Sequence, residues 1–285
     1  MRILITGSKG QLGNEIQQLA NDYPSYIFDY TDIDELDITN SQKVDAYFDA
    51  TQPQVVINCA AYTAVDKAET DEVTAFLVNA KAAENLARSA SRLGALIVHV
   101  STDYVFDGTS YVPYNELDKT NPQSAYGRSK LAGEDAVFQN ATNGIILRTS
   151  WLYSAFGNNF VKTMIKYGKE RPVLKVVFDQ IGTPTYAKDL AKAILDIIPI
   201  AITHSGTNLY HYSNEGVASW YDFAKLVIEF CGIDCDIKPI LTKDYPLPAK
   251  RPFYSVLNKS KIKETFNLEI DHWSVSVKAC IKRLQ

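Results

Sequence analysis

Short apolar runs alternate with amphipathic stretches along the first half of the chain. The runs lie at residues 2–7, 26–30, 54–61, 95–102 and 144–150. The stretches between them have helical spacing and lie at residues 10–22, 41–52, 71–93 and 125–139. Most of the runs lack the polar alternation of a half-exposed strand, so they are typical of strands buried on both faces. Their order predicts an α/β fold with a doubly wound parallel sheet of the Rossmann type.

After residue 150 the alternation of strands and helices becomes less regular. The pattern predicts helices at residues 158–170, 187–198, 219–232, 258–266 and 272–284, and strands at residues 173–177, 208–213 and 236–241. We expect residues 1–150 to form a dinucleotide-binding domain. We expect residues 151–285 to form a smaller α/β C-terminal lobe that binds the substrate, with the chain able to cross between the two.

Charge and composition narrow the classes of partner. The formal net charge of −4 is spread over 285 residues without long runs of one sign, so we expect no nucleic acid partner and no polybasic membrane contact. No stretch approaches the roughly 18 apolar residues that span a bilayer, and the N-terminus lacks a secretory apolar core. The cysteines match no zinc or disulfide pattern, which predicts a cytoplasmic protein. They are Cys59, Cys231, Cys235 and Cys280.

A glycine-rich turn follows the first predicted strand and opens the first predicted helix. Gly7, Gly10 and Gly13 have the spacing G-x-x-G-x-x-G, not the G-x-G-x-x-G of many dehydrogenases. Bare backbone at such a turn admits a pyrophosphate, and the helix N-terminus supplies N–H groups and partial positive charge. The alternative is a plain strand–helix turn. We predict cofactor contacts from the three glycines and from Gln11 and Leu12 between them.

An acidic residue is expected about 20 residues beyond the glycines, where it accepts hydrogen bonds from the adenine ribose. We prefer Asp32 to the neighbouring Asp29 and Asp37, and we include Asp37 and Ile38 among the predicted cofactor contacts. A carboxylate here repels a 2′-phosphate and favours NADH. Lys9, inside the glycine loop, can instead pair with that phosphate, so the choice between NADH and NADPH stays open.

The third predicted strand ends in small residues, which let the chain pass close beneath a cofactor. Ala61, Tyr62 and Thr63 lie nearest the carboxyl edge, where ligands bind in such sheets, and we predict that they contact the cofactor. For Cys59 and Ala60, tight packing of strand against helix explains the small side chains equally well.

Tyr126 and Lys130 lie four positions apart on one predicted helix, so their side chains share a face. Lowering the pKa of a tyrosine from about 10 by two to three units takes about 3–4 kcal/mol. An ammonium about 4.5 Å away supplies about 3.7 kcal/mol at an effective dielectric constant near 20. We therefore predict that Lys130 makes Tyr126 acidic. The alternative is a chance pair on a surface helix, because the chain contains 17 tyrosines.

Several motifs together resemble the dTDP-4-dehydrorhamnose reductases, a family of extended short-chain dehydrogenases/reductases. They run from end to end of the chain and include GSKGQLG, VVINCAAYTAVDKAE, STDYVFDG, NPQSAYGRSKLAGE, RTSWLY, GNNFVKTM, DQIGTPT and RPFYSVLNKSK. The resemblance implies catalytic roles for Tyr126, Lys130 and Thr102. It also implies sugar-nucleotide contacts from Thr102, Asp103 and Trp151, although Trp151 can equally be a core tryptophan.

The family's reaction is a reduction that belongs to dTDP-rhamnose biosynthesis. The resemblance implies that NADPH or NADH delivers hydride to C4 of dTDP-4-dehydro-6-deoxy-L-mannose while Tyr126 donates a proton, giving dTDP-L-rhamnose. Thr102 would hold the C4 oxygen, and Lys130 would bind the nicotinamide ribose. Arg251 and Arg148 can pair with the diphosphate of the dTDP-sugar, or can be ordinary surface arginines.

Proteins with other functions share the predicted fold. A sugar-nucleotide 4,6-dehydratase carries Asp-Glu after the strand-end threonine, whereas Asp103 is followed here by Tyr104. Another sugar-nucleotide reductase or an epimerase remains open, as does a non-catalytic regulatory subunit resembling that of methionine adenosyltransferase. Some family members are associated with a divalent cation such as Mg²⁺. Glu15 has no carboxylate cluster around it, so we assign no metal-ligating residues, and whether a divalent cation binds stays open. A homodimer is one possible assembly.

Overall fold

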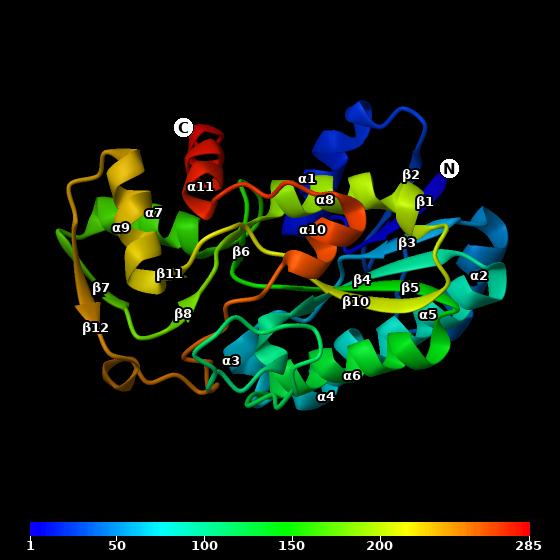
Figure 1. Ribbon diagram of the computed structural model, residues 1–285, viewed down its shortest axis with the longest axis horizontal. Coiled ribbons are helices and arrows are strands. Elements are labelled where there is room, and N and C mark those ends of the chain that lie inside the picture. The colour runs from blue at the N-terminus through cyan, green and yellow to red at the C-terminus, as the bar shows by residue number, and fades with distance from the viewer.

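A sheet of six parallel strands, in the order β10-β5-β4-β3-β1-β2, forms the centre of the computed structural model, which describes residues 1–285 (Figure 1). The predicted doubly wound α/β fold is confirmed, and each apolar run contains a strand. The strands are β1 (Arg2–Thr6), β2 (Ile27–Thr31), β3 (Val55–Asn58), β4 (Leu96–Thr102), β5 (Asn143–Thr149) and β10 (Gly206–His211).

Helices cover both faces of this sheet (Figure 1). Successive strand residues point to opposite faces, so Ile3 and Ile5 enter one buried cluster while Leu4 enters the other. Burial on both sides explains why the strands show no polar alternation. One face carries α1 (Gln11–Leu19), α8 (Ala187–Ala201) and α10 (Ser260–Phe266), with the short 3-10 turn η1 (Ala20–Asp22) after α1. The other carries α2 (Ser41–Thr51), α5 (Ala82–Leu93) and α6 (Ala125–Asn140).

The long helix predicted over residues 71–93 is confirmed as one continuous helical stretch over residues 72–93, with a π-helical turn inside it. A β-carbon at Gly133 of α6 would lie 2.2 Å from the Asn79 backbone oxygen, so the two helices pass very close at this point. Asn79 is buried, and its amide bonds the Tyr62 backbone and the Ser129 hydroxyl. These tertiary contacts coincide with a π-helical turn. The segments are α4 (Glu72–Phe76), η2 (Leu77–Lys81) and α5, and the separate short helix α3 (Val65–Ala68) precedes them.

The chain returns to the central sheet after leaving it. Strand β10 pairs with β5, and α8 packs against α1. Leu190, Ile194 and Ile198 of α8 are fully buried in the sheet core. The apolar face of α8 is removed from water only by packing on this sheet. A single boundary at residue 150 therefore does not describe the first part, because residues 187–211 also belong to it.

A smaller lobe packs beside the carboxyl ends of the sheet strands (Figure 1). Its own core contains 16 buried residues, mostly from helices and from one pair of parallel strands. The helices are α7 (Phe160–Glu170), α9 (Trp220–Cys231) and α11 (Trp273–Lys282), and the paired strands are β7 (Val173–Val177) and β12 (Asp236–Ile240). The shorter elements are β6 (Leu152–Tyr153), β8 (Ile181–Gly182), β9 (Thr185–Tyr186), β11 (Ala218–Ser219), η3 (Asp103–Val105) and η4 (Thr242–Asp244). None of the helices combines the length and apolarity required to cross a membrane.

Candidate active site

The glycine turn has the geometry expected of a pyrophosphate site. Gly7 has a φ of +64°, and a β-carbon there would lie 2.6 Å from Ala60 Cα. A β-carbon at Gly13 would lie 2.5 Å from Ser8 Cα, so this position also requires glycine. Gly10 precedes α1, and no side chain caps the first turn of the helix. The uncapped N–H groups are the donors that a phosphate would take up.

A cavity of about 460 Å³ lies beside this turn. Its polar rim contains Asp32, whose Oδ2 accepts a hydrogen bond of 3.0 Å from the Lys9 backbone N–H. The Lys9 ammonium binds Asp34 at 3.0 Å and Glu35 at 3.1 Å. The cavity fits the adenosine half of a dinucleotide. Of the predicted cofactor contacts, it is lined by Gly7, Gly10, Asp32, Asp37, Ile38 and Ala61.

The other predicted cofactor residues lie outside this cavity. The Gln11 side chain accepts a hydrogen bond from Asn159, and Leu12 is buried in the sheet core, so each would meet a pyrophosphate through its backbone. The Tyr62 hydroxyl donates to Asp71 at 3.1 Å. Thr63 accepts a backbone hydrogen bond from Val65. Their roles stay predictions.

Thr102 and Tyr126 come together at the carboxyl edge of the sheet. Thr102 ends β4, and Tyr126 lies in the first turn of α6, which Ser124 caps by accepting from the Gly127 N–H. The Thr102 side chain lies close enough to the Tyr126 phenol to act on its pKa. The Thr102 hydroxyl donates to Asp103 Oδ1 at 3.1 Å, and burial raises the pKa of this carboxyl to about 6.

The prediction that Lys130 lowers the pKa of Tyr126 is wrong for this geometry. Burial raises the pKa of the Tyr126 phenol, and the nearby Thr102 side chain opposes the rise only in part. The Lys130 ammonium instead donates to the Val100 carbonyl at 2.6 Å. Desolvation outweighs any attraction between the two groups. Tyr126 is therefore protonated at neutral pH, which is the state that a proton donor needs.

Arg148 is a structural residue and not a diphosphate ligand. Its guanidinium donates to both carboxylate oxygens of Glu134, at 2.9 and 2.6 Å, and the two side chains are only 4% and 2% exposed. The Ser101 hydroxyl donates to the same carboxylate at 2.5 Å. These bonds tie β4, β5 and α6 together beneath the candidate catalytic residues.

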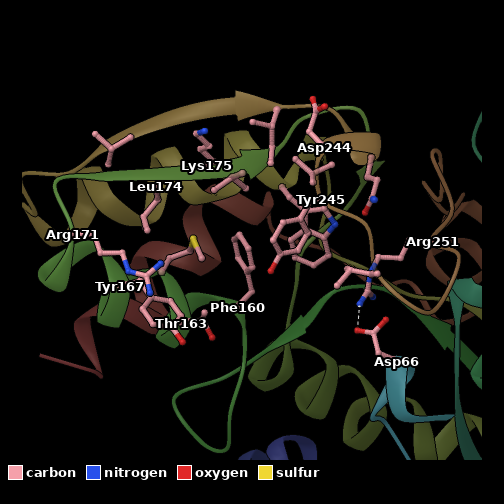
Figure 2. A pocket seen from close by; sticks show the side chains of 18 residues that line it. Asp66, Phe160, Thr163, Tyr167, Arg171, Leu174, Lys175, Asp244, Tyr245 and Arg251 are labelled. Carbon is pink, nitrogen blue, oxygen red and sulfur yellow. Dashed lines mark hydrogen bonds and ion pairs between the residues drawn. The ribbon is translucent and has the colours of Figure 1, made fainter. Parts of the chain in front are cut away.

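A second cavity, of about 830 Å³, lies in the smaller lobe between α7, β7 and β12 (Figure 2). Phe160 and Trp220 lie on its wall, with Arg171 at one end and Arg251 at the other. Of the predicted substrate residues, only Arg251 lines it. Apolar spacing predicts Phe160 and Trp220 as core residues of their helices, so sequence patterns alone do not single them out.

Trp151 supports this cavity from behind. Its ring stacks on Trp220 with centroids 3.6 Å apart and an angle of 9° between the planes. A β-carbon at Gly182 would lie 2.7 Å from Trp151 Cε2, so only glycine leaves room for this indole. Trp151 also adopts a φ of +48°, a strained backbone for a bulky residue. The aromatic face that the cavity presents is that of Trp220.

The chain matches a known protein family along its whole length. A family model described as the RmlD substrate binding domain matches residues 1–285. The chain belongs to this family. The resemblance to dTDP-4-dehydrorhamnose reductases is thereby confirmed.

Relatives of the RmlD family match the chain along its whole length. A dTDP-4-dehydrorhamnose reductase of Aggregatibacter actinomycetemcomitans is 41% identical, with 97% of each chain covered. The crystal structure of a dTDP-4-dehydrorhamnose reductase from Clostridium acetobutylicum is 47% identical, with a TM-score of 0.95 and all of both chains covered. That of the Bacillus anthracis enzyme, solved in complex with NADP, is 38% identical, with a TM-score of 0.94 and 99% of each chain covered.

The cation associated with some RmlD family members does not fit the residues of this chain. Glu15 is fully buried, and both of its carboxylate oxygens accept from Arg283, at 2.9 and 2.7 Å. The Ser154 hydroxyl donates to the same carboxylate at 2.6 Å. No group of three or more metal-ligating side chains occurs in the structure. Arg283 already neutralises the carboxylate that a cation would need.

The burial of Lys130 predicts a pH-dependent stability. Burial lowers the pKa of its ammonium from 10.5 to about 8, although Glu134 opposes the shift. Between these two pH values the unfolded chain binds more protons than the native one, so stability rises with pH. We expect the unfolding free energy of the wild type, relative to Lys130→Met, to rise by about 3 kcal/mol across this window.

Urea denaturation of the wild type and of Lys130→Met at several pH values measures the difference between their unfolding free energies. The ionisation of the tyrosines contributes equally to both proteins and cancels in this difference. A difference that stays flat across the window would contradict the buried position of the ammonium.

Proposed function

We propose that the protein reduces the C4 keto group of dTDP-4-dehydrorhamnose, giving dTDP-L-rhamnose, with NADH or NADPH as the hydride donor. The observation that carries this proposal is the close approach of Thr102, at the end of β4, and Tyr126, at the start of α6, at the carboxyl edge of a dinucleotide-binding sheet. The reductases that match the chain over its whole length support it.

The bound dihydronicotinamide would supply hydride to C4 of the sugar. Tyr126 donates a proton from its hydroxyl to the C4 oxygen, on which negative charge develops. Its raised pKa keeps that proton in place until the oxygen becomes basic. The Thr102 hydroxyl is placed to bind the C4 oxygen and then to stabilise the Tyr126 phenolate. We assign to Lys130 the binding of the nicotinamide ribose.

The second cavity is suited to bind the nucleotide diphosphate part of the substrate. Its volume of about 830 Å³ lies within the usual range for small-molecule sites. Aromatic walls at Phe160 and Trp220 suit a pyrimidine base, and Arg251 supplies a cation for the diphosphate. Tyr104 connects the wall of this cavity to the candidate catalytic residues by side-chain contacts, because it touches both Arg251 and Tyr126.

Oxidation of NADH and of NADPH by purified protein in the presence of the dTDP-4-keto sugar tests the proposal. We expect turnover with at least one cofactor, and NMR of the product then assigns its configuration at C4. Cofactor binding without turnover would contradict the reductase and favour a regulatory subunit. A product epimeric at C4 to the rhamnose derivative would favour a different sugar-nucleotide reductase.

We also propose that the protein works in the cytoplasm. All four cysteines are free thiols, as is typical of a reducing compartment. Burial raises the pKa of Cys59, in the wall of the cofactor cavity, to about 12. This thiol therefore stays protonated and unreactive next to the cofactor.

A further inference from the structure

A strap of residues 242–251 follows β12 and borders the second cavity (Figure 2). Beyond the short turn η4 it contains no helix or strand. It contributes Asp244, Tyr245, Leu247 and Arg251 to the cavity lining. One end is held by Asp179, which accepts from the Thr242 N–H at 2.9 Å and from its hydroxyl at 2.7 Å. The other end is held by a contact with the first part of the molecule.

Asp66 of α3 is the anchor at this end, and it uses both carboxylate oxygens. Oδ1 accepts from the Ala249 N–H at 3.2 Å. Oδ2 accepts from Arg251 Nη2 at 2.7 Å, the pair marked by a dashed line in Figure 2. One side chain therefore holds both the backbone and the arginine of the strap, although Asp66 and Arg251 are 185 positions apart in the chain.

Arg251 also reaches toward the candidate catalytic residues. Its Nη1 donates to the Tyr104 hydroxyl at 2.9 Å. The Tyr104 ring lies edge-on to Tyr126, with centroids 5.5 Å apart. A guanidinium has five N–H donors, and these two bonds leave three of them without a partner in the protein. Arg251 is thus fixed in position and still able to bind an anion at the cavity wall.

We propose that Asp66 is a positioning residue for the nucleotide diphosphate, which presents Arg251 and keeps the strap closed along the cavity. This inference rests on the proposed function and deepens it. An arginine held in its binding rotamer loses less conformational freedom when a ligand arrives, so its hydrogen bonds contribute more to affinity. A carboxylate repels a diphosphate. Asp66 therefore acts on the bound diphosphate only through its ion pair with Arg251, and not as a direct ligand.

Replacement of Asp66 by asparagine tests the proposal, because the amide retains an acceptor for the Ala249 N–H but loses the charge that holds Arg251. We expect the Kd for dTDP, measured by calorimetry without turnover, to rise about tenfold. The KM for the dTDP-sugar should rise by a similar factor. The Kd for the dinucleotide and kcat should change less than about threefold, which a general structural defect would not reproduce.

Glu72→Gln is the matched control. Glu72 begins the neighbouring α4, and the substitution weakens its ion pair of 2.9 Å with Arg128 of α6, in which both side chains are somewhat more exposed than Asp66. Neither residue lines the two cavities. We expect its dTDP affinity and melting temperature to match those of the wild type. The effects of Asp66→Asn and Arg251→Lys should not add in the double variant, because both act through one contact.

Several results would overturn the proposal. An Asp66→Asn variant that binds dTDP as Glu72→Gln does would show that the anchor is not needed. Tighter binding would mean that Asp66 competes with the diphosphate for Arg251. Equal losses in dTDP and dinucleotide affinity would indicate a structural role. If wild-type protein does not bind dTDP, the proposed function fails, and this inference fails with it.

Discussion

Replacing Tyr126 by phenylalanine is expected to lower kcat about 10²- to 10⁴-fold, the usual contribution of a positioned general acid. The substitution removes only the hydroxyl that lies near Thr102, and the ring keeps its edge contact with Tyr104. Without that proton, the C4 oxygen must take one from water while its charge develops. Steady-state oxidation of the preferred dinucleotide with the dTDP-4-keto sugar measures the loss.

Cofactor affinity separates this effect from damage to the fold. We expect the Kd of the Tyr126→Phe variant for the dinucleotide to stay within about twofold of the wild type, because we propose that the pyrophosphate and adenosine bind at the glycine turn. Tyr23→Phe is a suitable control, since it removes a hydroxyl that bonds Asp196, far from both cavities. A Tyr126→Phe variant that keeps wild-type kcat would show that another group donates the proton.

Truncating Arg148 to alanine is expected to destabilise the protein by about 3–5 kcal/mol, the usual cost of breaking a buried ion pair by removing one partner. Glu134 would keep its charge at 2% exposure, with only the Ser101 hydroxyl as a close hydrogen-bond donor. Urea denaturation at neutral pH measures the loss. Replacing Glu134 and Arg148 together by methionine should cost less than Arg148→Ala, because the Glu134 carboxylate no longer stays buried without its partner.

Arg128→Ala provides the comparison at the surface. Arg128 pairs with Glu72 at 2.9 Å, but both side chains are more than two-fifths exposed, so water replaces the lost partner. We expect a cost below about 1 kcal/mol. If Arg148→Ala costs no more than Arg128→Ala, the buried network does not stabilise the fold as described.

The central sheet was predictable because its signals are local. Ile3, Leu4 and Ile5 are consecutive apolar residues, and only a strand covered on both faces buries all three. The predicted helix over residues 71–93 is confirmed, but the π-helical turn within it was not predictable. It coincides with the close passage of Gly133 past Asn79, and these residues meet only after the sheet has brought α6 beside the segment.

The two arginines considered for the diphosphate show the same limit. Arg148 and Arg251 look alike in the sequence, but one is paired with Glu134 in the interior and the other lines a cavity. The pair of Tyr126 and Lys130 was placed correctly on one helix, yet the predicted shift of the tyrosine pKa had the wrong sign. That sign depends on burial and on the Val100 carbonyl, which takes the ammonium.

Local spacing was enough to establish the order of strands and helices, the glycine turn, and the motifs that reveal the family. These features depend on residues within a few positions of each other, where backbone geometry and side-chain periodicity act directly. Charge states, ion-pair partners and cavity walls were decided by the folded chain. Desolvation and Coulomb interactions depend on distances in space, and Asp66 meets Arg251 only because folding closes a separation of 185 residues.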